Sequence, residues 1–223
     1  MKIKNMNSTL KYSILKFKYK KVGNTIKITS CDPNVVGKLV IPDMIDELPV
    51  TSLSQYAFSD CTELTSVTLP NSIKSIGNAA FAYSTSLTSV TIPDSVTFIG
   101  HSAFYQCRGL TRVTIHDNIT SIPNHMFFGC SGLTNVTLPS SITSIGEAAF
   151  AGCSGLKRIT IPNSVKYIRE YAFSGCSKLT NVTLPSSINV IGWYAFRGCI
   201  GLSTKNIKVD LNIIEKVLAS VIG

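Results

Sequence analysis

The chain has 223 residues and a formal net charge of +9, from 21 Lys and Arg against 12 Asp and Glu. A hydrophobic content of 44% with only 15% charged residues is too apolar for a disordered chain. No apolar run reaches the ~18–20 residues that span a bilayer, so we expect a soluble protein without a transmembrane segment.

The positive charge is concentrated at the N-terminus. Residues 1–31 contain eight lysines and no acid, whereas from Asp32 onward 13 basic residues face 12 acidic ones. Such asymmetry is typical of an arm that binds nucleic acid or an anionic membrane. The first residues lack the apolar stretch of about 7–15 residues that marks a secretory signal, which indicates a protein not exported by the ordinary route.

Residues 12–30 predict a β-hairpin. Apolar residues alternate with lysines up to Tyr19 and alternate again from Ile26, with a Gly-Asn turn between them. We therefore expect residues 1–35 to form a basic N-terminal region with a capping hairpin. Lysines in such a strand keep one face solvated and discourage edge-to-edge pairing. Because this role accounts for the charge, the charge is weak support for a nucleic-acid partner.

A period of 23 residues organises the rest of the chain. Phenylalanine recurs at this spacing, at Phe58, Phe81, Phe104, Phe127, Phe150, Phe173 and Phe196. The consensus unit reads L-x-x-V-T-L-P-x-x-I-x-x-I-G-x-x-A-F-x-x-C-x-x. No unit can bury its own apolar face, so the units must stack. The sequence thus predicts a solenoid of about seven coils over residues 36–203.

Each segment of the unit predicts one part of a coil. V-T-L alternates like a half-buried strand with Thr outward, and the Pro ends that strand's ladder. The next apolar pair suits a short second strand or a tight turn, and G-x-x-A-F suits a turn or a single helical turn with Ala and Phe inward. Because Pro123 takes the Gly position once and Pro cannot adopt φ > 0, we expect that Gly to serve close packing.

The C-terminal residues 204–223 predict a capping helix. Asp210 is suited to cap a helix over residues 211–221, whose apolar residues fall on one face. That helix is expected to cover the last coil.

The repeat resembles the 23-residue class of leucine-rich repeats in BspA-type surface proteins of bacteria and protists. The resemblance covers roughly residues 36–202. It implies a β-rich leucine-rich-repeat solenoid, a right-handed coil with a main strand plus a short second strand or helical turn per repeat. It also implies adhesion or host-protein binding at a cell surface, so the compartment stays open between the surface and the cytoplasm. Pro42 lies five residues further upstream of Phe58 than the period predicts, which indicates an insertion in the first coil.

Six of the seven cysteines follow a Phe by three residues, and Ser84 takes the place of the missing one. Zinc sites need converging ligands, but no two cysteines here lie closer than 23 residues. Disulfides between neighbouring coils would fit a Cα separation of ~5 Å. A ladder of buried thiols is the favoured interpretation, because serine readily replaces a small packed thiol.

Signatures of catalysis are missing from the sequence. It contains no G-x-S-x-G, no phosphate loop and no H-E-x-x-H. We therefore expect no enzyme activity, no cofactor and no metal site.

The residue before the β-branched position of each strand varies between coils. These residues are Ser66, Ser89, Arg112, Asn135, Arg158 and Asn181. We interpret the face that they line as the binding surface, with Arg112, Lys157, Arg158, Asn135, Asn181 and His116 as candidate binding residues. His116 belongs to the irregular unit 110–130, where drift and function are both open. A second candidate surface is aromatic, around Tyr171, Trp193 and Tyr194, with packing beneath the C-terminal helix as its alternative.

The functional hypothesis is a non-catalytic, monomeric interaction module that presents its strand face to a protein or glycan ligand. The alternative is binding of nucleic acid or an anionic membrane through the Lys-rich N-terminus, and of these partners nucleic acid is not favoured.

Overall fold

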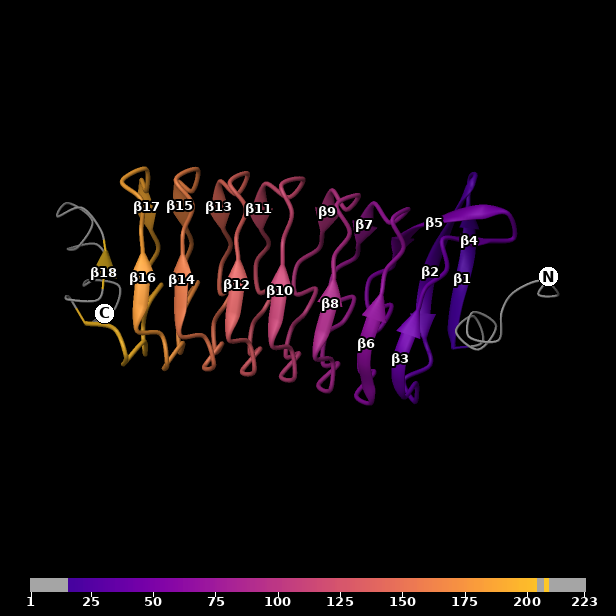
Figure 1. The fold of residues 1–223 in the computed structure, drawn as a ribbon, viewed down its shortest axis with the longest axis horizontal. Helices are drawn as coiled ribbons and strands as arrows, with labels where there is room; N and C mark the ends of the chain where they lie inside the picture. Colours follow the sequence, from indigo (N-terminus) through magenta and orange to yellow (C-terminus); the bar gives the residue numbers. More distant parts are fainter. Residues whose placement is uncertain (1–15, 204–206, 209–223) are drawn as a thin grey trace.

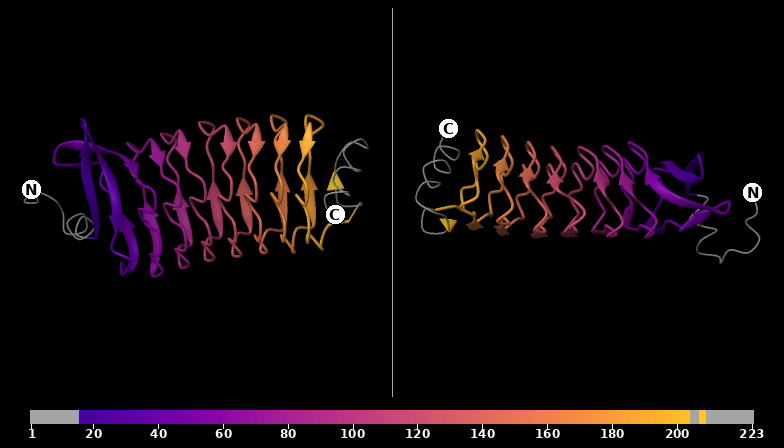
Figure 2. Two further views of the ribbon diagram at one scale, coloured as in Figure 1. Left: turned by 180° about the vertical axis from the view of Figure 1, so that it is seen from behind. Right: turned by 90° about the horizontal axis from the view of Figure 1, so that it is seen from above.

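The computed structural model describes residues 16–203 and 207–208, and every regular element within them is a β-strand. The strands form two parallel rows along an elongated rod, with β1 and β18 at opposite ends (Figure 1). The two further views show the coils following one another along the rod (Figure 2). The β-solenoid with 23-residue coils is the architecture that the sequence predicted.

The main row consists of one strand per coil. Its strands are β3 (Gly37–Val40), β6 (Leu64–Thr68), β8 (Ser89–Thr91), β10 (Arg112–Thr114), β12 (Asn135–Thr137), β14 (Arg158–Thr160), β16 (Asn181–Thr183) and β18 (Ile207–Lys208). Neighbours pair one period apart, so that Val67 lies opposite Val90 and Thr68 opposite Thr91. From β8 to β16 the central Val or Ile is buried and both flanking residues are exposed. The Thr column therefore points outward, as its alternation predicted.

The second row contains the short strands that follow the proline. They are β5 (Leu48–Leu53), β7 (Ser75–Ile76), β9 (Phe98–Ile99), β11 (Ser121–Ile122), β13 (Ser144–Ile145), β15 (Tyr167–Ile168) and β17 (Val190–Ile191). The isoleucine points into the coil, while the residue before it faces outward to a varying degree. The second residue of the apolar pair, such as Ile76, thus lies in a short strand, whereas the first, such as Ile73, precedes that strand.

The G-x-x-A-F segments form turns that close each coil. All seven phenylalanines of the repeat are fully buried. Their rings stack from coil to coil with centroids 5.2 to 5.6 Å apart. Stacked aromatic pairs of this kind add about 0.5–1.5 kcal/mol each beyond simple burial. The ladder of rings is continuous from Phe58 to Phe196 and ties all the coils together.

The glycine that precedes four of these turns is closely packed against the preceding coil. A Cβ at Gly77 would lie 2.5 Å from the carbonyl carbon of Ser54 in the preceding coil, and one at Gly146 would lie 2.6 Å from the amide of Asn124. Neither glycine has a positive φ. The expectation drawn from Pro123 is confirmed.

Left-handed backbone occurs instead in two other columns, which sequence analysis missed. The column two residues before Phe has φ between 48° and 58° in every coil, and non-glycine residues fill it: Tyr56, Ala79, Ser102, His125, Ala148, Tyr171 and Tyr194. The column two residues after Phe is also left-handed, from Asp60 to Gly198. Such residues are uncommon and carry a local cost, which the surrounding coil must offset.

The N-terminal end is closed by an antiparallel hairpin of β1 (Phe17–Val22) and β2 (Thr25–Cys31). Strand β2 pairs with β5 and extends the second row, which leaves β1 as its edge strand. Phe17 is buried, whereas Lys18 and Lys20 are exposed on that edge. Exposed lysines on an edge strand discourage pairing with other chains. Residues 1–15 and the capping helix expected over residues 211–221 lie outside the described part of the chain.

The insertion expected in the first coil is a second small hairpin. Strand β4 (Met44–Ile45) pairs antiparallel with the start of β5. Asp46 and Glu47 form its turn with φ of 50° and 64°. Two successive left-handed residues are the geometry of a type I′ turn. The Tyr19 hydroxyl donates a hydrogen bond to Asp46 Oδ2 over 3.1 Å, which joins the two hairpins.

Each row of strands is interrupted once within the described residues. The second row separates between β9 and β11, and the main row between β12 and β14. In a regular coil the Gly146 amide donates to the Ile122 carbonyl oxygen over 2.8 Å. Pro123 occupies the equivalent position after β11 and has no N–H to donate toward β9. The irregular unit thus opens the second row.

The interruption of the main row coincides with Lys157. Threonine precedes the other main strands from β8 to β16, and the Thr134 hydroxyl and amide both donate to the Thr111 carbonyl oxygen, over 3.2 and 3.1 Å. Lys157 has no hydroxyl. Within the described residues its backbone amide donates no hydrogen bond to the Thr134 carbonyl oxygen either. Strands β12 and β14 therefore face each other without a ladder.

Candidate functional site: the strand face

We call strand face the outward side chains of β8, β10, β12, β14 and β16, together with the residue that precedes each strand. Four predicted residues lie in a single row of this face. Arg112 is opposite Asn135 in the β10–β12 pair, and Arg158 is opposite Asn181 in the β14–β16 pair. All four are exposed. The period alone was sufficient to place them together.

A further cation extends the row. Lys38 on β3 is exposed and lies opposite Ser66 on β6. The 23-residue period does not place Lys38 in this row, because the insertion in the first coil lengthens its distance to the next Phe. The sequence could have revealed its position, because the Leu39-Val40-Ile41-Pro42 segment that follows it aligns with V-T-L-P of the later coils.

The strand face carries positive charge and no carboxylate. Its cations are Arg112, Lys157 and Arg158, and none of the strands from β6 to β16 contains Asp or Glu. The side chains of these three residues make no ion pair or hydrogen bond within the described residues. Charges that no neighbouring carboxylate neutralises attract an anionic ligand over a distance of about one Debye length.

The interruption of the main row forms a groove on this face. Its volume is about 440 Å³, and residues of β12 and β14 line both sides. Asn135 and Arg158 lie at the start of the two strands, and Thr137 and Thr160 at their ends. The half-buried Pro162 also lines the groove, whereas Ile159 is buried inside the coil. The groove therefore combines a guanidinium, an amide and hydroxyls with the apolar ring of a proline.

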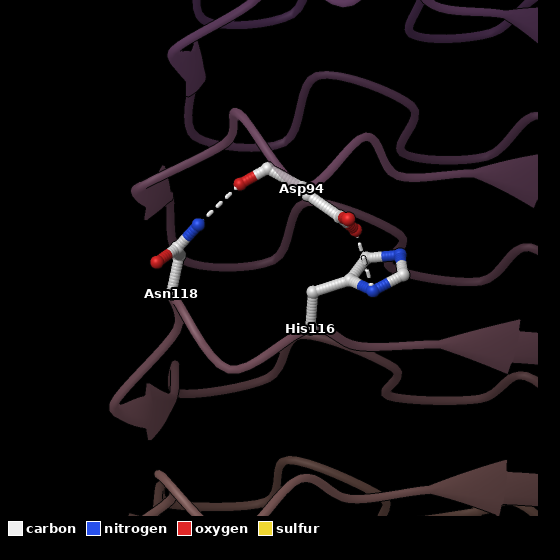
Figure 3. A network of polar contacts seen from close by, with 3 residues as sticks. All are labelled: Asp94, His116 and Asn118. Carbon is white, nitrogen blue, oxygen red and sulfur yellow. Dashed lines mark hydrogen bonds and ion pairs between the residues drawn. The ribbon is translucent and has the colours of Figure 1, made fainter.

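The structure places His116 outside this row. His116 follows the end of β10, and its Nδ1 lies 2.7 Å from Asp94 Oδ1 in the preceding coil (Figure 3). Asn118 Nδ2 donates a hydrogen bond to the backbone carbonyl oxygen of the same Asp94. In a regular coil the equivalent of Asn118 is a serine, and Ser95 Oγ donates to the Ile73 carbonyl oxygen over 2.6 Å. The irregular unit thus ties itself to its neighbour with different side chains.

The repeated cysteines are free thiols that are buried inside the coils. Sγ of Cys107, Cys130, Cys153, Cys176 and Cys199 each donates to the carbonyl oxygen of the phenylalanine of the preceding coil, over 2.9 to 3.2 Å. Burial raises the pKa of the Cys130 thiol to about 12. A protonated, enclosed thiol is a poor nucleophile and a poor metal ligand. In the described residues no three His, Cys, Asp or Glu side chains converge as a metal site would need.

The aromatic candidate surface lies at the C-terminal end of the second row. Tyr171 and Tyr194 stack with ring centroids 5.3 Å apart, and the Arg197 guanidinium lies 5.2 Å from the Tyr194 centroid. Trp193 is 78% exposed. The helix proposed to cover this surface falls outside the described residues.

No helix with the length and apolarity of a membrane span occurs among the residues that the structure describes.

Comparison with known families gives one match. Residues 51–173 and 97–218 match the family model of the BspA type leucine rich repeat region, in six copies. A search of curated proteins finds no match.

Solved structures with a similar fold include bacterial leucine-rich repeat proteins. A leucine-rich repeat protein of T. pallidum is 32% identical with a TM-score of 0.81, over 86% of this chain and 90% of that one. A leucine rich cell surface protein from Faecalibacterium prausnitzii A2-165 is 25% identical with a TM-score of 0.59, over 87% and 75% of the two chains. One from Eubacterium ventriosum is 24% identical with a TM-score of 0.54, over 72% and 58%, and supports the fold alone.

Proposed function

Because the chain belongs to the BspA-type leucine-rich repeat family, we propose that it is a non-catalytic interaction module that binds a protein or glycan through its strand face. The observation that carries this proposal is the row of Arg112, Asn135, Arg158 and Asn181. These side chains vary on a frame that is otherwise constant from coil to coil, which is how solenoids carry specificity. The charges of Arg112 and Arg158 are unpaired within the described residues, so no internal carboxylate competes with a ligand for them.

The proposal includes adhesion at a cell surface. Support comes from the family and from the F. prausnitzii relative, which is described as a cell surface protein. The module is proposed to act as a monomer, without a cofactor. We assign binding to the strand face rather than to the N-terminal lysines, because exposed Lys18 and Lys20 already have a role in protecting the edge strand β1.

The test is binding of the purified chain to candidate matrix proteins and to a glycan array, with a double variant Arg112→Glu and Arg158→Glu. Reversal of two charges should abolish binding if the strand face holds the ligand. A second variant, Lys18→Glu with Lys20→Glu, should bind as the parent does. Binding that survives in the first variant and disappears in the second would transfer the function to the N-terminal lysines.

A further inference from the structure

The strand face has an unusual chemistry for a protein-binding surface. From β8 to β16 its outward residues are threonine, serine, asparagine, arginine and lysine only. The exposed aromatic residues of the described chain, such as Phe98, Tyr171 and Trp193, all lie elsewhere. Stable protein interfaces concentrate aromatic and aliphatic side chains at their centre. A surface of hydroxyls, amides and cations instead matches a ligand that is rich in hydroxyl groups and negatively charged.

The cations of the row are spaced regularly. Arg112, Asn135, Arg158 and Asn181 occupy successive coils, so that a guanidinium alternates with an amide. Strands of neighbouring coils lie ~4.8 Å apart, which places the two arginines on the order of 10 Å from each other. A pyranose unit is about as long as one such step between coils. A linear polysaccharide along the rod would therefore meet one cation for every two sugars.

The groove between β12 and β14 offers a binding site for one sugar ring within this row. It lies between Asn135 and Arg158, and the half-buried ring of Pro162 adds an apolar surface to its lining. Sugar rings present an apolar C–H face together with hydroxyls at their rim. The hydroxyls of Thr137 and Thr160 line the same groove and are placed to pair with that rim.

We propose that the ligand of the strand face is an acidic polysaccharide in which a charged sugar alternates with a neutral one, lying along the rod across β10 to β16. Arg112 and Arg158 bind successive carboxylates, because a guanidinium donates two parallel hydrogen bonds to such a group. Asn135 and Asn181 bind the neutral sugars between them. This inference rests on the proposed function and names the ligand class of the same face.

The test uses four polymers of defined charge. Hyaluronan carries one carboxylate on every second sugar, polygalacturonate carries one on every sugar, dextran carries none, and polyglutamate is an acidic polypeptide. Binding of the full chain to each is measured by calorimetry at one low salt concentration. We expect the tightest binding for hyaluronan and none for dextran.

Two double variants test the site. Arg112→Ser with Arg158→Asn places on the strand face residues that other coils carry in the same column, so the fold is maintained. Each lost charge-assisted contact should weaken hyaluronan binding about tenfold. Lys74→Thr with Lys166→Thr removes the same charge from the second row, again with a residue found in that column, and should leave binding unchanged.

The outcomes separate the inference from the proposed function. Equal binding of dextran, tighter binding of polygalacturonate, or no binding of hyaluronan overturns the alternating acidic polysaccharide while leaving the strand-face module intact. Preference for polyglutamate overturns the glycan and makes an acidic protein the partner. Hyaluronan binding that both double variants reduce equally is nonspecific attraction to a basic chain, and it overturns the inference as well.

Discussion

The hydroxyl of Ser84 donates a hydrogen bond to the carbonyl oxygen of Phe58, 2.7 Å away, in the same geometry that Cys107 adopts toward Phe81 over 2.9 Å. Serine thus replaces the thiol both as a hydrogen-bond donor and as a small packed side chain. We expect Ser84→Ala to lower the free energy of unfolding by about 1–3 kcal/mol, because it leaves a buried carbonyl without this donor. Ser84→Cys should cost less. Urea denaturation of both variants checks the order, and equal losses would contradict it.

Stability should fall at alkaline pH because of the buried thiols. Burial raises the pKa of Cys130 from 9.0 to about 12, so above pH 9 this thiol ionises in the unfolded chain while it stays protonated in the folded one. The unfolded state then binds fewer protons, and the free energy of unfolding decreases by about 1.4 kcal/mol per pH unit for this thiol. Cys130→Ser should therefore show a flatter decline between pH 9 and about 12. Denaturation curves that stay parallel for parent and variant would refute the assignment.

Gly77→Ala should destabilise the rod. The added Cβ would lie 2.5 Å from the Ser54 carbonyl carbon, which cannot rotate away as a flexible side chain would. Overpacking of this kind costs about 1–3 kcal/mol. Ser54→Ala, in the same column of the preceding coil, is the matched control and should change the free energy of unfolding by less than about 0.5 kcal/mol. Thermal denaturation of the two variants provides the comparison.

Lys157→Thr should stabilise the protein. It supplies the hydroxyl that Thr134 and Thr180 use to bond the carbonyl oxygen of the preceding coil, over 3.2 Å in each case. One regained hydrogen bond contributes about 0.5–1.5 kcal/mol. Hydrogen exchange should also slow at Lys157 and Arg158 as β14 approaches β12. Unchanged exchange would mean that the groove is held open by something other than this side chain.

The contact between His116 and Asp94 should contribute little energy. Their atoms lie 2.7 Å apart, but the Asp94 side chain is 79% exposed and the His116 side chain 34%. Exposed ion pairs typically contribute about 0.2–1 kcal/mol. A double-mutant cycle with His116→Ala and Asp94→Ala should yield a coupling energy in that range. A coupling above about 2 kcal/mol would indicate that the irregular unit depends on this pair.

The period predicted most of the fold because every column of the repeat meets its own copy in the next coil. Once Phe104 is placed inward, Phe127 must stack on it, and the rings are 5.6 Å apart. The outward Thr column and the row from Arg112 to Asn181 follow from the same register. That these residues bind a ligand is not contained in the period, and it stays a proposal.

The features that sequence analysis missed depend on backbone groups rather than on side-chain patterns. Pro123 and Lys157 are visible as departures from their columns, but their effect depends on which amide and hydroxyl donate to the preceding coil. The left-handed column before Phe contains residues as different as Ala148 and Tyr171, so no glycine signals it, whereas the column after Phe has glycine from Gly129 onward. Lys38 was hidden by the hairpin that lengthens the first coil.

The two interruptions of the strand rows fall at different steps along the rod, one between β9 and β11 and the other between β12 and β14. At each of them the other row remains paired and the stack of phenylalanine rings continues. The two interruptions are therefore staggered, so that no step along the described part of the rod lacks both rows of strand pairing. A stretching or shearing load on the rod would therefore find no plane along which both rows of strands are already separated.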